Sequence, residues 1–250
     1  MDLLIYLETK SSRADYIFRH IFHHILGLEI QFSFDPHSFT DYKGPKINYS
    51  KKAFSNELFF YSSDFLFETN IEHKHVDMSK YKGIDVFFLC SKGALPFDPF
   101  AASFYMLSRY EEYLSSKKDS LGRFYVEDSL AFKYQFITNP VVDHWIIFIQ
   151  NILINHFSNM VFLKRSFSFI NTIDIDNAYA YLNKGFIRTF ATLVKDLITL
   201  NFQNNFRRIK VLLGVEKDPY DTYIRIFNLH QKYNLKTILF FLTGNYGRYD

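Results

Sequence analysis

The chain begins with a short apolar run that a helix follows directly, and this order constrains the fold more than any other feature. Ile5 and its neighbours have the length and composition of a strand. Ser11 and Ser12 can then cap a helix that extends to about Leu26, where Gly27 can end it. A strand followed by a helix predicts an α/β fold.

Three later segments also have strand character: residues 28–34, 58–61 and 86–90, which are rich in Phe, Ile and Tyr. The last of them contains Cys90, the single cysteine of the chain. One cysteine cannot form an intramolecular disulfide or a thiolate metal cage, so Cys90 is predicted to be a buried strand residue. The sequence leaves the pairing order of the strands open.

Three helices are predicted to begin where an Asx residue precedes proline, at Asp98, Asn139 and Asp218. The Asx side chain can accept hydrogen bonds from free backbone N–H groups, and proline fits the first helical position. The third helix is expected to extend to Tyr233. Apolar residues recur at helical spacing after the first two starts, namely Phe100, Phe104, Leu107 and Leu114, and then Val142, Trp145, Ile146, Ile149 and Leu153.

The composition excludes several protein classes. A hydrophobic fraction of 48% and a charged fraction of 22% exclude disordered, collagenous and coiled-coil chains. A net charge of +3 creates no field for a polyanion, so no nucleic-acid partner is expected. The N-terminus lacks a basic leader and no apolar window reaches about eighteen residues, which predicts no transmembrane segment and a cytoplasmic location. The 20% aromatic content favours a core, with sugar stacking as the alternative.

A domain boundary is predicted near residue 165, where Lys164 and Arg165 precede an alternating apolar strand over residues 167–174. The predicted organisation is an N-terminal α/β domain of unknown role over residues 1–165 and a second domain over residues 166–250. Residues 178–213 are predicted to be mostly helical, and a final strand is expected over residues 236–242. A strand, a helical crossover and a second strand form a parallel βαβ unit.

Two carboxylates follow the apolar run at residues 167–173, and they are the strongest candidates for chemistry. Because alternate residues of a strand share one side, Asp174 and Asp176 are expected on one side and Ile173 and Ile175 on the other. Two acids on an apolar strand favour a bound cation, since each charge otherwise repels its neighbour. The alternative is that Asp176 or Asn177 caps a helix.

Residues 172–176, Thr-Ile-Asp-Ile-Asp, resemble the first motif of the NodB-type polysaccharide deacetylases, carbohydrate esterase family 4. Residues 97–113, 139–145 and 172–181 resemble a bacterial subgroup in which this deacetylase domain follows an uncharacterised N-terminal α/β domain. The resemblance extends from about residue 85 to the end of the chain.

The resemblance implies a distorted (β/α) barrel of NodB type, of which this chain holds the first βαβ part. It also implies a hydrolase of carbohydrate metabolism that removes N-acetyl groups from sugar residues of a glycan. The implied cofactor is a divalent metal, expected to be zinc, held by one Asp and two His. Asp174 is then the catalytic base and Asp176 the metal ligand. The most common version of the motif has adjacent acids, whereas Ile175 separates them here.

The family's histidine motif follows a strand such as residues 238–242, and neither it nor the later arginine and proton-donor motifs occur before Asp250. The chain is therefore expected to be truncated within the deacetylase domain and inactive by itself. Other histidines are weaker candidates: His73 and His75 favour a polar loop, and His20, His23 and His24 a helix surface.

Three further features have mainly structural interpretations. His230 is expected to complete the last turn of its helix. The basic residues at 207–210 favour a solvated helix end over contact with anionic lipid. Arg109, Glu111 and Glu112 favour surface ion pairs, or the lining of a substrate groove within the resemblance. The alternative function is a non-catalytic carbohydrate-binding or scaffolding protein in cell-surface glycan assembly, in which the aromatic-rich N-terminal domain binds the glycan.

Overall fold

A computed structural model describes residues 2–115 and 117–242 of the chain. The chain divides into two compact units, Met1–Lys164 and Arg165–Asp250. Residues 243–250 of the predicted second domain lie outside the described residues. Both units combine helices and strands, so the predicted α/β class is confirmed.

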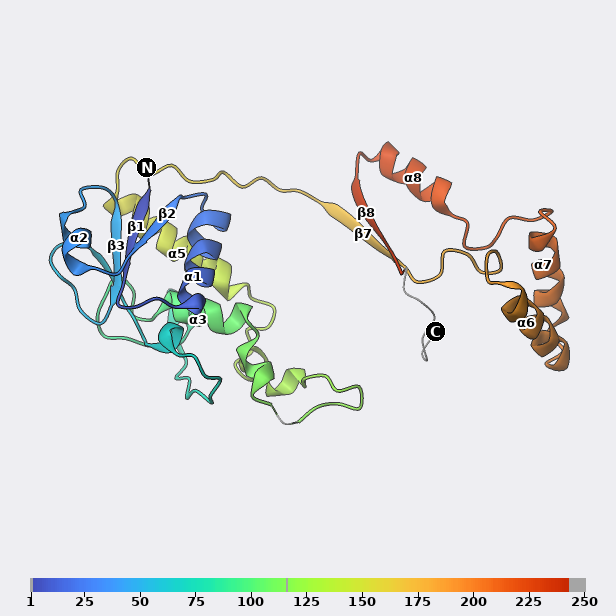
Figure 1. Cartoon of the computed structure of the whole chain (residues 1–250), viewed down its shortest axis with the longest axis horizontal. Helices are drawn as coiled ribbons and strands as arrows, with labels where there is room; N and C mark the ends of the chain where they lie inside the picture. The colour runs from blue at the N-terminus through green and yellow to red at the C-terminus, as the bar shows by residue number, and fades with distance from the viewer. Residues whose placement is uncertain (1, 116, 243–250) are drawn as a thin grey trace. The chain divides into compact units, whose positions relative to one another are not determined.

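The first unit contains a four-stranded parallel sheet in the order β2-β1-β3-β4 (Figure 1). Its strands are β1 (Leu3–Leu7), β2 (Ile30–Ser33), β3 (Lys46–Ser50) and β4 (Leu58–Tyr61). The first strand of the chain therefore lies inside the sheet, paired with β2 on one side and β3 on the other.

Strand β3 has no counterpart among the sequence predictions, because it buries polar side chains. Asn48 and Ser50 are almost fully buried, and the Ser50 hydroxyl donates to Asn48 Oδ1 over 2.7 Å. Asn48 Nδ2 donates to Glu57 Oε1 over 2.8 Å. These local bonds satisfy groups that would otherwise oppose burial.

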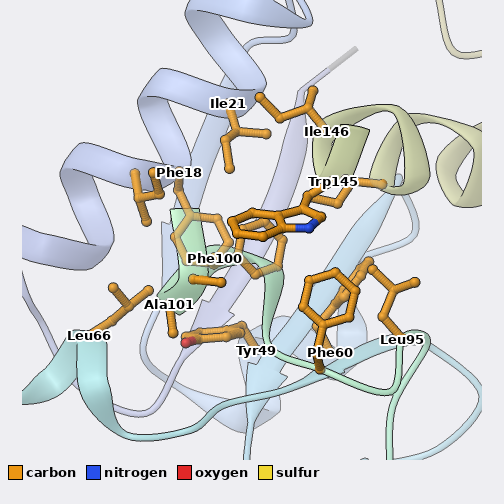
Figure 2. Packing of buried hydrophobic residues seen from close by; sticks show 14 of the residues in the cluster. Phe18, Ile21, Tyr49, Phe60, Leu66, Leu95, Phe100, Ala101, Trp145 and Ile146 are labelled. Atoms are coloured by element: carbon orange, nitrogen blue, oxygen red, sulfur yellow. The ribbon is translucent and has the colours of Figure 1, made fainter. Parts of the chain in front are cut away.

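Helices cover both faces of the sheet. On one face lie α1 (Ser12–Phe18), α3 (Pro99–Leu107) and α5 (Val141–His156). Phe100 of α3 stacks on Phe18 with ring centroids 4.4 Å apart and meets the edge of Tyr49 at 5.4 Å (Figure 2). On the other face, Phe39 of α2 (Pro36–Asp41) packs on Tyr6 of β1 at 5.5 Å. Buried aromatic rings thus make up much of this unit's core, as the favoured interpretation of their abundance expects, while others such as Tyr16 and Tyr113 are exposed.

The local start signals of α1 and α3 are confirmed. The Ser11 hydroxyl accepts a bond from the N–H of Ala14, and the Asp98 carboxylate accepts bonds from Phe100 and Ala101. After α1 the chain continues as a π-helix, η1 (Arg19–Ile25), which the sequence did not predict. The predicted end at Gly27 is confirmed, since Gly27 has φ +70° and a Cβ there would lie 2.7 Å from that of Leu163.

Two predictions for the later helices are wrong. Helix α3 ends at Leu107 instead of continuing to Leu114, because Arg109 adopts a left-handed φ of +54°. Helix α5 has Pro140 at its cap position, and Asn139 contributes its backbone carbonyl rather than its side chain. The remaining short helices of this unit are η2 (Phe65–Phe67), η3 (Tyr110–Tyr113), η4 (Val126–Asp128) and α4 (Leu130–Lys133).

The predicted strand over residues 86–90 is also wrong. The structure has a hairpin of β5 (Ser79–Tyr81) and β6 (Ile84–Val86). Strand β6 ends at Val86, two residues before Phe88, whose backbone adopts a φ of +56°. Cys90 is half-buried and lies outside any strand. Burial raises the pKa of its thiol to about 11, which keeps it protonated and unreactive.

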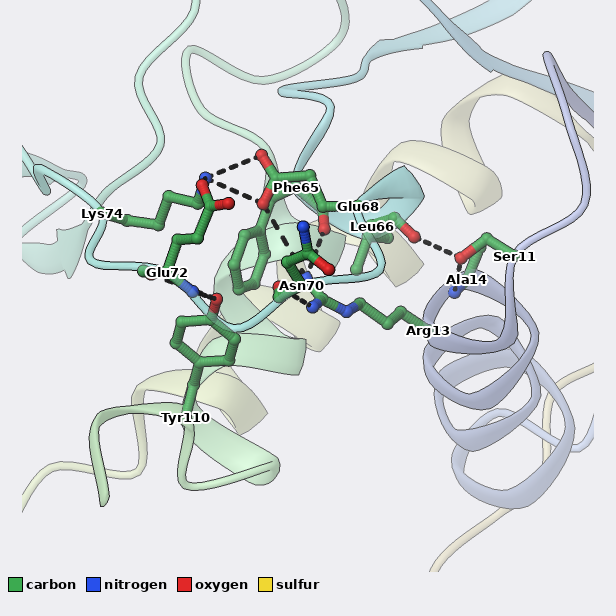
Figure 3. Close-up of polar contacts among 10 residues, drawn as sticks. All are labelled: Ser11, Arg13, Ala14, Phe65, Leu66, Glu68, Asn70, Glu72, Lys74 and Tyr110. Carbon is green, nitrogen blue, oxygen red and sulfur yellow. Dashed lines mark hydrogen bonds and ion pairs between the residues drawn. The ribbon is translucent and has the colours of Figure 1, made fainter. Parts of the chain in front are cut away.

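Polar contacts tie the irregular segment after β4 to α1 (Figure 3). The Arg13 guanidinium donates to the carbonyls of Phe65 at 2.9 Å and Asn70 at 2.6 Å. The Tyr110 hydroxyl accepts from the N–H of Glu72 over 2.9 Å. These bonds explain how a segment with little regular structure can close one side of the core.

The second unit contains two parallel strands, β7 (Ile170–Ile175) and β8 (Lys236–Phe241), joined by a helical crossover. The crossover holds α6 (Phe186–Ile198), α7 (Phe202–Leu212) and α8 (Tyr223–Lys232). The expected βαβ connection is therefore present. Within residues 165–242 the strands form one two-stranded sheet, and a barrel is not formed.

Candidate active site around Asp174 and Asp176

Asp174 is the next-to-last residue of β7, and Asp176 directly follows the strand. Both side chains are exposed, whereas Ile173 before Asp174 and Ile175 between the two acids are half-buried. The alternation agrees with the strand geometry expected from the i, i+2 spacing. The structure thus brings the two predicted site residues to the same side of one strand end.

A cavity of about 430 Å³ adjoins these carboxylates. One wall is the end of β7 with Asp174, Asp176 and Asn177, and the other is the segment that leads into α8 with Tyr220 and Tyr223. Aromatic rings and carboxylates together can contact a polar ring-shaped ligand.

Tyr223 connects the two walls. Its hydroxyl donates a 2.7 Å hydrogen bond to the backbone carbonyl of Ala178. Burial, and then the neighbouring Tyr179, raise the pKa of Tyr223, so the hydroxyl keeps its proton near neutral pH. Tyr223 therefore fixes the loop after Asp176 against the start of α8.

Asp218 supplies a second connection, and here a sequence prediction is wrong. Helix α8 begins at Tyr223, and Asp218 does not cap it. The Asp218 carboxylate instead accepts four backbone N–H groups: those of Ala180 and Tyr181 at 2.8 Å, Tyr220 at 2.9 Å and Leu182 at 3.1 Å. Burial would raise the pKa of Asp218, but these N–H donors outweigh burial and lower it.

His230 lies in the last turn of α8 and is buried. Its Nε2 lies 3.1 Å from the Asn171 amide nitrogen and its Nδ1 lies 2.8 Å from the Thr237 hydroxyl. Asn171 and Thr237 are direct partners in the β7–β8 register. His230 therefore joins the helix to both strands, in addition to ending its own helix.

The described residues do not complete a metal site. Among residues 2–115 and 117–242, no group of three or more His, Cys, Asp or Glu side chains is placed to hold an ion. Catalytic zinc usually needs three protein ligands, and this strand end supplies two carboxylates. His75 lies 3.0 Å from Asp77, and neither His73 and His75 nor His20, His23 and His24 belong to such a group among the described residues, so neither histidine group gains support as a metal site.

The basic residues at 207–210 are already paired. Arg207 lies 3.0 Å from Glu216, Arg208 lies 3.0 Å from Asp196, and the Lys210 ammonium lies over the Phe206 ring. This pairing favours the structural interpretation of the cluster.

No helix within residues 2–115 and 117–242 is both long enough and apolar enough to cross a membrane.

Comparison with known protein families shows a match for the first unit. The model of a family of unknown function, DUF7033, matches residues 3–158, which extend from β1 to the end of α5. None of the curated proteins and none of the solved structures matches the chain.

Proposed function

The chain belongs to the family of unknown function DUF7033 through residues 3–158, and we propose that its chemistry belongs to the other unit, as metal-dependent removal of N-acetyl groups from sugars. The observation that carries this proposal is the pair Asp174 and Asp176 at the carboxyl end of a parallel strand, beside a cavity. Reactive groups of α/β proteins collect at such strand ends.

The two acids have different proposed roles. Asp174 acts as the general base, since a carboxylate beside the cavity can accept the proton of an attacking water molecule. Asp176 acts as a metal ligand, in keeping with the resemblance of residues 172–176 to the deacetylase motif. The described residues do not fit a complete zinc site, so the other ligands have to come from outside them.

The substrate class follows from the same cavity. Tyr220 and Tyr223 offer ring faces and hydroxyl groups, and Asn177 offers an amide, which suits an N-acetylated sugar or a polysaccharide. The rival proposal is a non-catalytic carbohydrate-binding or scaffolding protein. Phe18, Tyr49 and Phe100 of the first unit's core are fully buried, so a glycan bound by that unit would have to contact other side chains.

The test separates the two acids. The protein is expressed together with any residues encoded after Asp250, and acetate release from an N-acetylglucosamine tetramer is measured with the metal content. Asp174→Asn should keep the metal and lose turnover by a factor of about 10² or more. Asp176→Ala should lose the metal.

Asp221→Asn is the matched control, because it removes one charge near the cavity without changing its lining. It should retain both metal and turnover. Equal metal content in the Asp174 and Asp176 variants would contradict the assigned roles. A protein without acetate release would favour the rival proposal.

A further inference from the structure

The first unit contains an open cavity of about 790 Å³, in addition to the one beside Asp174 in the second unit. Its lining residues all fall between positions 105 and 137. Its walls come from the end of α3, from η3, from the excursion before η4 and from α4. Cavities that bind small ligands typically have volumes of about 300–1,000 Å³. The space is therefore large enough for several linked sugar rings.

Two polar side chains of the lining, Tyr105 and Glu111, are shielded from solvent by the surrounding protein. Tyr105 is buried, and Glu111 accepts a 2.7 Å hydrogen bond from the N–H of Leu130. Burial raises the pKa of both groups. A carboxylate held in place beside a buried tyrosine is a feature of binding sites more than of ordinary surfaces.

The charged side chains of the lining balance one another. Arg109 pairs with Glu112, and Arg123 pairs with Asp119 at 2.8 Å. Asp119 also accepts backbone bonds from Leu121 and Arg123, which fix the turn that carries the second pair. In total, four basic and four acidic side chains line the cavity, so its net charge selects neither an anion nor a cation.

An aromatic side chain completes the lining. Tyr125 is 43% exposed although it belongs to the cavity, whereas the rings of the core are buried. An exposed ring beside fixed hydrogen-bonding groups offers a flat apolar face at low entropic cost.

We propose that this cavity binds a neutral saccharide. Sugar hydroxyls both donate and accept hydrogen bonds, which suits a lining of paired carboxylates and guanidinium groups. The apolar face of a sugar ring suits Tyr125, whereas a wholly apolar ligand would desolvate the charged groups of the lining without replacing their hydrogen bonds to water. The proposal does not depend on deacetylation, because every residue that carries it belongs to the DUF7033 region.

Calorimetric titration of the whole chain tests the proposal, with chitotriose in its N-acetylated form and cellotriose as probes and with EDTA present. The wild-type protein should bind at least one of them with a Kd of about 1 mM or tighter. Tyr125→Ala and Glu111→Gln should each weaken binding tenfold or more. Glutamine keeps an oxygen that can accept from Leu130, so the fold should persist.

Tyr134→Ala is the matched control, because Tyr134 is a similarly exposed tyrosine of the same region and is not part of the lining. It should bind as the wild type does. Circular dichroism checks the fold of every variant. Absence of binding to both probes at 10 mM, or equal binding by wild type, Tyr125→Ala and Glu111→Gln, would overturn the proposal.

Discussion

The hydroxyl of Tyr49 donates a 2.7 Å hydrogen bond to the carboxylate of Asp98, and both side chains are completely buried. The same carboxylate accepts bonds from the backbone and the hydroxyl of Ser63 and caps α3. One side chain thereby joins β3, the loop after β4 and the start of α3.

Asp98→Ala should destabilise the first unit by about 3–5 kcal/mol, because it leaves several buried donors without an acceptor. Tyr49→Phe should cost about 1–2 kcal/mol, since it removes one bond and keeps the ring. Urea unfolding followed by the fluorescence of Trp145, the single tryptophan, measures both. Equal unfolding midpoints for wild type and Asp98→Ala would show that the network does not stabilise the fold.

Glu57 should give the first unit a specific sensitivity to acid. Burial would raise its pKa, but donors from Asn48 and the N–H groups of Phe54 and Ser55 lower it from 4.5 to about 2. Because the folded-state pKa lies below the unfolded value, the stabilisation is present above pH 4.5 and is lost as the pH falls towards 2.

Glu57→Gln should therefore be less stable than wild type by about 1–2 kcal/mol near pH 6, after allowance for solvent screening, and the gap should close near pH 2. Thermal melts over this pH range measure the gap. Glu127→Gln, at an exposed glutamate, serves as the control and should follow the wild type. A gap that does not change with pH would contradict the role of Glu57.

Asp218→Asn should loosen the loop that follows Asp176. The loss of a charged acceptor for the N–H groups of Ala180, Tyr181 and Leu182 should speed their hydrogen exchange by about tenfold or more. Exchange measured by mass spectrometry resolves this segment. Asp221→Asn, which removes the same charge nearby, should leave it unchanged, and equal acceleration in both variants would refute a specific anchor.

Residues 1–165 should fold without the remainder of the chain. The core cluster of the first unit extends from β1 to α5, and its helix caps are local. Differential scanning calorimetry of this fragment should give one cooperative transition. A broad transition for the fragment beside a sharp one for the whole chain would show that the boundary divides a single core.

The 250-residue chain should associate as its concentration rises and should bind zinc weakly. Ile238, Phe240 and Leu242 are exposed on or beside β8, and exposed apolar strands favour association. Sedimentation velocity should show oligomers for the whole chain and monomers for residues 1–165. Stoichiometric zinc binding by a monomer of the whole chain would instead reveal a site that the sequence analysis missed.

The features that the sequence predicted correctly depend on residues that are close together in the chain. Ser11 and Asp98 cap helices through N–H groups two or three residues away, and the alternation around Asp174 needs only the geometry of one strand. Asp218 presents the same Asp-Pro signal as Asp98, yet its carboxylate accepts from residues 36 to 38 positions away. A local signal does not distinguish these two outcomes.

The sequence also did not predict that β3 buries polar residues. Asn48 and Ser50 make Lys46–Ser50 too polar for a strand by composition, and only their contacts with each other and with Glu57 allow it. The run that ends at Cys90 shows the reverse case, since it is apolar enough for a strand but turns away at Phe88. The roles of Asp174 and Asp176 stay predictions, because their chemistry depends on groups that the described residues do not include.

The place of β1 inside the sheet has a consequence for synthesis. Leu3–Leu7 is synthesised before both of its neighbours in the sheet, since β2 begins at Ile30 and β3 at Lys46. At about 5–20 residues per second, the nascent chain exposes this apolar strand for several seconds, long enough for chaperones to bind it. A chain that lacks Leu3–Leu7 would lose a strand from inside the sheet, so β2 and β3 would have no shared partner on which to assemble the core.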